Sequence, residues 1–234
     1  MFHKRVVLSA IIFFLAMTLY GFGLDSLESF GITGGVMYIN NSSDEGAPSP
    51  IMPYLGAAAS FAINEKYFFE PSIVFNGNYY LWSEKEGMAL PAEIEYADSV
   101  LLLNIFLDCP FVMKYQITKN VAFGGLASPL LVFRIPLKTW GEGDSQESDI
   151  LSYFYGGRFL FLEAGALVEW DYSPKHSLKA RLDILFPVFH LWDGDSFSDQ
   201  LSLRLSLTFS FMTKNAQAKK AAAQSSAEPA PAAE

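Results

Sequence analysis

Hydrophobic and polar residues alternate without a break near the C-terminal end of the chain. Every second residue from Leu201 to Phe211 is Leu or Phe, and the residues between them are Ser, Arg or Thr. Successive side chains of a β-strand point to opposite faces, so this segment predicts a strand with one apolar face and one polar face. A strand of a soluble β-sandwich would give the same pattern, so the rest of the chain must decide between the two.

Seven further segments carry the same two-residue period and are separated by turn-like sequence. Their lengths are close to the roughly 9 to 11 residues with which a tilted strand crosses a bilayer. Glycines interrupt the first segment, and glycines and Pro129 interrupt the fifth, which weakens both as strands. The predicted strands cover about residues 30–40, 55–63, 69–81, 101–113, 121–134, 160–170, 178–188 and 201–211.

The connections between these segments alternate between short and long. Short connections lie at residues 64–66, 118–120 and 173–176, and long ones at about 41–49, 83–95, 136–150 and 193–199. Membrane barrels have short turns on one side and longer loops on the other, whereas a sandwich has no reason to alternate. We therefore predict an all-β fold, an eight-stranded antiparallel up-and-down transmembrane β-barrel with both ends on the short-turn side.

Charge and aromatic residues indicate the orientation of this barrel. Each short turn carries a Lys, whereas the long loops are rich in Asp and Glu, so the long loops are expected to face outward. Aromatic residues gather near the two proposed membrane interfaces, where amphipathic rings are stable. These aromatic residues are Tyr79, Tyr80, Trp82, Tyr96, Trp140, Tyr153, Tyr155 and Trp192 on the long-loop side and Tyr67, Tyr115, Trp170, Tyr172, Phe209 and Phe211 on the other.

Composition limits the remaining classes of protein. The chain is 51% hydrophobic and 15% aromatic, yet after residue 23 no apolar run approaches the roughly 18 residues of a membrane-spanning helix. The formal net charge of −9 makes a nucleic-acid partner unfavourable. Cys109 is the only cysteine, so a disulfide within the chain is excluded.

The two ends of the chain differ in composition from the predicted barrel. A basic start at Lys4 and Arg5, an apolar stretch and small residues before position 24 are typical of a secretory signal peptide. After Thr213 the sequence turns to Ala, Lys, Gln, Ser, Glu and Pro without periodicity, which predicts a disordered tail. We thus expect a signal peptide at 1–23, the barrel at 24–213 and a periplasmic tail at 214–234.

This layout resembles the small eight-stranded outer-membrane barrels of bacteria, namely the transmembrane domain of the OmpA type and the OmpX, OmpW and opacity-protein types. The resemblance rests on the signal segment, the alternation of strands and turns, and the final strand Leu201 to Phe211, which looks like the C-terminal assembly signal of such barrels. It implies outer-membrane lipid and the barrel-assembly machinery as partners, an extracellular partner at the loops and a monomeric state. The usual terminal Phe is, however, followed here by 23 residues.

The candidate functional residues are charged side chains on the polar, inward faces of the strands. An eight-stranded barrel is just wide enough for side chains to fill it, so residues of both signs are expected to form a salt-bridged polar interior. A narrow polar passage is the alternative. The interior set is Glu70, Asp108, Lys114, Arg134, Glu163, Glu169, Lys179, Arg181, Asp183 and Arg204.

An enzymatic function would have to use a histidine. His176 lies in a short turn, and His190 lies near Asp193, Asp195 and Ser196, which supplies residue types for nucleophilic hydrolysis but not a triad. No motif indicates a metal or a cofactor. We therefore expect a non-enzymatic structural or surface-interaction role, with a conduit for small or apolar solutes as the alternative and a hydrolase or acyltransferase as the third class.

Overall fold

The computed structural model describes Gly21 and residues 23–40, 51–92, 99–140, 144–190 and 201–218. The predicted signal segment, two of the long loops and most of the tail lie outside these residues. The described elements are η1 Leu24–Ser26, β1 Leu27–Ile39, β2 Ile51–Ala62, β3 Tyr67–Phe69, β4 Ser72–Ser83, β5 Met88–Ala92, β6 Val100–Asp108, β7 Phe111–Thr118, β8 Val121–Thr139, α2 Asp144–Tyr155, β9 Leu160–Ser173, β10 His176–Pro187, η2 Val188–His190 and β11 Ser202–Met212.

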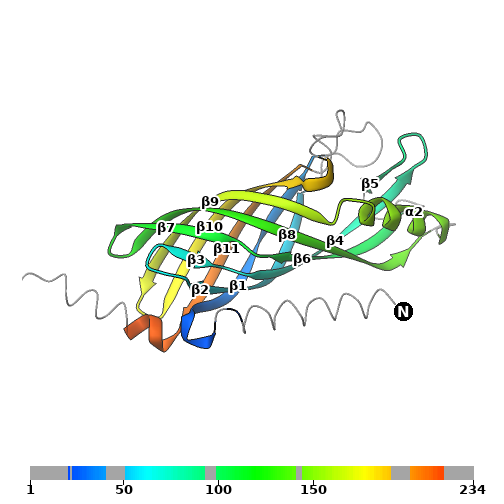
Figure 1. Cartoon of the computed structure of the whole chain (residues 1–234). Helices are drawn as coiled ribbons and strands as arrows, with labels where there is room; N and C mark the ends of the chain where they lie inside the picture. The colour runs from blue at the N-terminus through cyan, green and yellow to red at the C-terminus, as the bar shows by residue number, and fades with distance from the viewer. Residues whose placement is uncertain are drawn as a thin grey trace, which may run out of the picture.

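The strands form one antiparallel sheet that closes on itself (Figure 1). β1 pairs with β2 on one side and with β11 on the other, and β8 pairs with β9, so the hydrogen-bonded ring is complete. β3 and β4 together form the third wall of the ring, and β6 and β7 form the fourth. The ring therefore has eight walls, and the predicted eight-stranded antiparallel barrel is confirmed.

Two neighbouring walls, each predicted as one continuous strand, are interrupted at a proline. Glu70 and Pro71 separate β3 from β4, and Cys109 and Pro110 separate β6 from β7. Proline lacks a backbone N–H and cannot donate to the ladder. The carbonyls still accept, since Glu70 N donates to Pro110 O at 3.0 Å and Ala59 N donates to Pro71 O at 3.0 Å. The ring stays closed across both interruptions.

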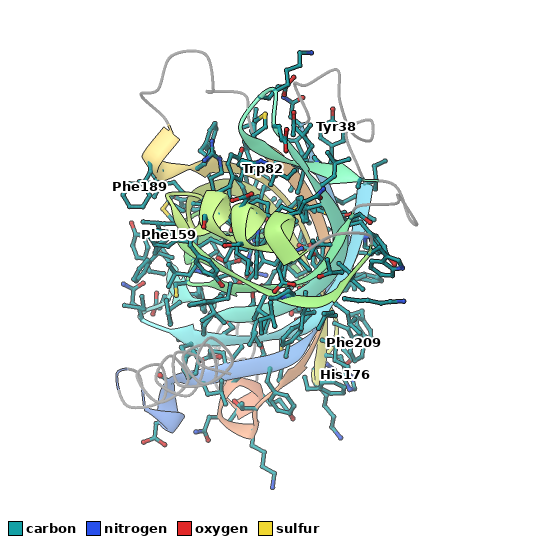
Figure 2. All side chains as sticks on the ribbon, turned by 90° about the vertical axis from the view of Figure 1, so that its right-hand side faces the viewer. Tyr38, Trp82, Phe159, His176, Phe189 and Phe209 are labelled. Carbon is teal, nitrogen blue, oxygen red and sulfur yellow. The ribbon has the colours of Figure 1, made fainter. Side chains whose placement is uncertain are left out.

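Two of the predicted long loops contain ordered structure. Within 83–95, β5 folds back on β4 through a tight turn in which Gly87 has a φ of +64°. Within 136–150, β8 continues to Thr139 and the chain then forms α2. The long-loop side thus carries a folded cap, and α2 lies at that end of the barrel, across the ring when viewed end-on (Figures 1 and 2).

The cap has a small apolar core of its own. Ile150 and Phe154 of α2 are fully buried against Tyr80, Val100 and Leu102 of the barrel wall. The ring of Tyr80 meets that of Phe154 edge to face at 4.9 Å. We predict both Tyr80 and Tyr153 at the membrane interface. Tyr80 is instead buried against Phe154 of α2, and Tyr153, a residue of α2 itself, packs partly buried against the same core.

The outer wall of the barrel is apolar, and the residues that alternate with the outward ones along each strand face the interior. Along β11 the leucines and phenylalanines are exposed, whereas the serines, Arg204 and Thr208 between them are buried. Figure 2 shows His176, Phe209, Phe189 and Tyr38 on the outside of the ring. No helix among the described residues is long and apolar enough to cross a bilayer.

Glycine permits close packing at the seam where β1 meets β11. A Cβ atom at Gly35 would lie 2.0 Å from the carbonyl oxygen of Leu205 and 2.9 Å from the hydroxyl of Tyr54. The Tyr54 side chain on β2 reaches across β1 at this point, and its hydroxyl donates to Leu205 O at 3.2 Å. The seam therefore depends on the missing side chain at position 35.

The start of β1 and the end of β11 meet at the short-turn end of this seam. Thr213 Oγ1 donates to Leu27 O at 2.8 Å and accepts from Ala216 N at 3.3 Å, which caps a turn of helix at residues 214–218. We expected a disordered tail from residue 214. Residues 214–218 instead form a short turn of helix, of which Ala216 is buried and Lys214, Asn215 and Ala218 are exposed.

Candidate functional site

The barrel interior is organised in layers stacked along its axis. The first charged layer, nearest the short turns, consists of Glu70, Lys114, Glu169 and Lys179. Lys114 Nζ lies 2.6 Å from carboxylate oxygens of both Glu70 and Glu169, and Lys179 Nζ lies 2.5 Å from the other oxygen of Glu70. Two lysines and two glutamates make this layer neutral. Each carboxylate gains another hydrogen bond, from Ser60 to Glu70 at 3.1 Å and from Ser177 to Glu169 at 3.0 Å.

The second charged layer lies about one pleat repeat further along and consists of Asp108, Glu163, Arg181, Asp183 and Arg204. Arg204 Nη2 contacts Asp108 at 2.7 Å and Glu163 at 2.5 Å, and its Nε lies 3.2 Å from Asp183. Arg181 bridges the same three carboxylates. All five side chains are buried, and these charge-assisted contacts offset part of the cost of desolvating them.

An apolar layer follows the second charged layer toward the long-loop end. It includes Met37, Met52, Phe106, Phe161 and Leu185, all buried and in mutual contact. We expected a polar interior throughout, and this half of the barrel differs because apolar residues occupy inward positions here. Two interior spaces, one beside the charged layers and one beside the apolar layer, have volumes of only about 20 and 10 Å³. Such spaces hold about one water molecule at most.

Arg134 lies apart from the other nine candidates, in a polar layer between the apolar layer and α2. It is in register with Asn104, which is in register with Asn76, so the three residues line adjacent walls. Its guanidinium lies over the ring of Phe154 at 3.9 Å, and Nη1 donates to Arg158 O at 2.8 Å. The Tyr155 hydroxyl also donates to the backbone oxygen of Arg134 at 2.8 Å. Arg134 therefore ties α2 to the barrel wall.

A larger cavity opens at the short-turn end. Its volume is about 410 Å³, and its lining includes Glu28, Lys66, Lys114, Glu169 and Ala216. It reaches the first charged layer and is bordered by the helical turn at residues 214–218. The cavity is thus a vestibule on one side of the barrel, closed at its inner end by the first charged layer.

The two histidines considered for catalysis occupy different surroundings. His176 stacks on Tyr172 and Phe209 on the outer wall, with ring centroids 5.9 and 5.6 Å away, and its Nδ1 lies 3.0 Å from Ser173 Oγ. His190 ends η2, and the acidic and serine residues proposed beside it lie outside the described residues. Among the residues that are described, no group of three or more His, Cys, Asp or Glu side chains could hold a metal ion.

The closed ring, its apolar outer wall and its buried charged interior define a transmembrane β-barrel of the bacterial outer-membrane type. In such a barrel every backbone group pairs within the ring, which is what a bilayer requires of a spanning sheet. The outward leucines and phenylalanines then face hydrocarbon.

Comparisons with known proteins give likenesses in structure but none in sequence. No protein-family model and no curated protein matches the chain. Among solved structures, the chain is similar to Ail, the attachment invasion locus protein of Yersinia pestis, in complex with the heparin analogue sucrose octasulfate, with 11% identity and a TM-score of 0.44 over 80% of this chain and 98% of that one. A de novo designed transmembrane β-barrel is similar at 9% identity and a TM-score of 0.38, over 78% and 95% of the two chains.

Proposed function

We propose that this protein is a monomeric, non-conducting scaffold of the outer membrane that presents its capped end to partners outside the cell. The observation that carries the proposal is the filled interior. Two charged layers and an apolar layer follow one another along the barrel axis, and the spaces beside them admit about one water each. A solute would have to break buried ion pairs and then displace a packed apolar layer.

The alternative role as a conduit has weaker support. The vestibule at the short-turn end stops at Lys114 and Glu169 of the first charged layer. At the other end, Ile150 and Phe154 of α2 are packed over the ring without exposure to solvent. An apolar solute would meet two charged layers, and an ion would meet the apolar layer.

Reconstitution in planar bilayers tests the filled interior. We expect the purified full-length barrel to give no steady unitary conductance, because Arg181 and Arg204 form buried ion pairs across the interior with Asp108 of the opposite wall. The control is the same preparation analysed for its heat-modifiable folded form, which shows that folded protein was inserted. A steady conductance that changes with Glu163→Gln or Arg181→Gln would sink the proposal.

We further propose that the short-turn end, with both chain termini, faces the periplasm. The short turns carry Lys66, Lys119 and Lys175, whereas the capped end carries acidic residues such as Glu84 and Glu147.

The capped end is also where α2 offers an exposed side, including Ser148 and Ser152, to an extracellular partner. At the periplasmic side, the alternating strand from Leu201 to Phe211 offers the assembly machinery its recognition segment.

Cysteine labelling on intact cells tests this orientation. In a Cys109→Ala background, we expect Ser148→Cys on α2 to react with a membrane-impermeant maleimide, since residue 148 is exposed on the capped end. Lys119→Cys is the matched control, exposed in a short turn, and should react only after the outer membrane is permeabilised. Labelling of position 119 but not of position 148 on intact cells would show that the barrel has the opposite orientation.

The proposed role includes no enzymatic step. The imidazole of His176 is engaged by aromatic rings and by Ser173 on the outer wall, which suits an interfacial position. Outer-membrane lipid is the partner of that wall, where exposed Leu182, Leu205 and Leu207 offer only hydrocarbon contacts.

A further inference from the structure

We infer that the turn joining β9 to β10 binds the phosphate group of a membrane phospholipid through the Nε2–H of His176, with Lys175 as the adjacent cation. The turn consists of Pro174 and Lys175, between the paired residues Ser173 and His176. The inference rests on the lipid contact proposed for the outer wall. It requires neither the proposed orientation nor the filled interior, because phosphate groups lie at the surface of either leaflet.

The first argument is the position of the imidazole proton. Ser173 Oγ accepts hydrogen bonds from Lys175 N at 3.2 Å and from His176 N at 3.1 Å. A hydroxyl oxygen has two acceptor sites and one hydrogen to donate, so both of its acceptor sites are used. Only the hydroxyl hydrogen remains for His176 Nδ1, which lies 3.0 Å from the same oxygen. Nδ1 is therefore the acceptor, and the proton of the neutral ring is on Nε2.

The local sequence explains this arrangement. Serine is favoured at the first position of a turn and proline at the second, and a serine hydroxyl in that position can accept from backbone N–H groups of the turn. The sequence Ser-Pro-Lys-His at residues 173–176 has this form. Met212 N also donates to Lys175 O at 2.8 Å, which holds the turn against β11. The tautomer of His176 is thus set by the backbone of the turn.

The second argument is the free donor on the outer wall. The imidazole stacks on Tyr172 and Phe209 with interplanar angles of 10° and 26°, and it meets Phe211 edge to face at 5.5 Å. Figure 2 shows His176 and Phe209 together on the outside of the ring. Within the described part of the chain, no residue accepts a hydrogen bond from Nε2. A half-buried N–H donor on this wall therefore takes its acceptor from the surroundings of the barrel.

The third argument is the level of this donor in the membrane. Partly exposed rings surround it at the short-turn end of the outer wall, namely Trp170, Tyr172, Phe209 and Phe211. Rows of aromatic rings on a membrane barrel lie at the level of the lipid headgroups. The acceptors that a phospholipid offers there are phosphate and ester oxygens. Lys175 is exposed and follows in the same turn, so its positive charge favours the charged phosphate.

The test is solid-state NMR of the full-length protein, labelled with ¹⁵N at histidine, in phosphatidylethanolamine bilayers. In mildly alkaline buffer the ¹⁵N shifts should show Nε2 of His176 as the protonated nitrogen. We expect lipid ³¹P to dephase the Nε2 signal more strongly than the Nδ1 signal, because only Nε2–H donates to phosphate. The variant His176→Phe keeps a ring in the aromatic row and identifies the two resonances by their loss.

Retention of phosphatidylethanolamine in native mass spectrometry gives a second measurement. Lys175→Gln and His176→Phe are each expected to weaken retention about fivefold, because each removes a phosphate contact of about 1 kcal/mol. Lys119→Gln is the matched control, since it removes an exposed lysine from a short turn without histidine and should leave retention unchanged. The heat-modifiable band shows that each variant is folded.

The outcomes separate this inference from the proposed lipid-facing wall. Acyl-chain protons in contact with Leu205, without ³¹P dephasing at His176, would overturn the inference and leave the proposed lipid contact intact. A ring protonated at Nδ1, or equal lipid retention in Lys175→Gln and the unaltered protein, would also overturn it. Absence of the acyl-chain contact at Leu205 would overturn both proposals.

Discussion

Replacing Arg204 by methionine is expected to lower the free energy of unfolding by about 3 to 5 kcal/mol. The substitution preserves much of the side-chain volume but leaves the buried carboxylates of Asp108, Glu163 and Asp183 with Arg181 as their only guanidinium partner. The loss is large because the remaining negative charges are buried and cannot regain water. Urea unfolding in lipid vesicles, followed by tryptophan fluorescence and by the heat-modifiable band, measures it.

The control for this experiment is Lys138→Met, which removes an exposed cation and should change the unfolding free energy by less than about 0.5 kcal/mol. Adding Asp183→Asn to Arg204→Met removes one of the surplus negative charges and should recover part of the loss. A cost below about 1 kcal/mol for Arg204→Met alone would mean that the second charged layer is hydrated rather than dry.

Valine at position 35 is expected to prevent the barrel from closing. A Cβ there would overlap the carbonyl oxygen of Leu205, which belongs to the facing strand β11, and would also displace the Tyr54 hydroxyl that joins β2 to β11. Backbone atoms cannot move aside as a flexible side chain can. We expect a destabilisation of more than about 3 kcal/mol and loss of most of the heat-modifiable folded form.

Gly77→Val provides the matched control for the seam. Gly77 also lies within a strand, but a Cβ there meets its nearest atoms only at 3.8 and 3.9 Å. It should fold with a stability within about 0.5 kcal/mol of the unaltered protein. If Gly35→Val folded as well as Gly77→Val, the close approach of β1 and β11 would not be required for closure.

The ring could be predicted from sequence because, in most strands, the two-residue period separates outward apolar residues from inward polar ones. In β11 the outward Leu203, Leu205 and Leu207 contrast with inward Arg204 and Ser206, so the two faces are distinct without any knowledge of neighbours. The alternation of short and long connections then supplied the number of walls and the direction of each. Neither inference needs contacts between distant residues.

The apolar half of the interior could not be predicted in this way. In the run Val100 to Leu103, both the inward and the outward residues are apolar, so the two-residue period disappears from the sequence. Inward residues such as Phe106 and Phe161 are distinguished from lipid-facing ones only by their partners across the ring. Such segments show that a strand is buried on both sides, but not what fills the barrel.

The cap and the separate position of Arg134 were missed for a related reason. The α2 segment begins with Asp and Ser and contains Glu147 and Asp149, a composition that suits a solvated loop, while Ile150 and Phe154 form only a short apolar face. By its place in the alternation of its strand, Arg134 is predicted to face inward like the other candidates. Its separation from the charged layers follows from the register of β6 and β8, which emerges only when the strands pair.

The origin of the second charged layer bears on how the protein enters its membrane. Arg181 and Arg204 come from the last two strands of the chain, whereas their partner Asp108 comes from β6, on the other side of the ring. A ribbon that entered lipid one hairpin at a time would carry isolated carboxylates into hydrocarbon before any guanidinium arrived. Insertion is therefore expected to be concerted, with the final strand delivered while the earlier ones are still shielded from acyl chains.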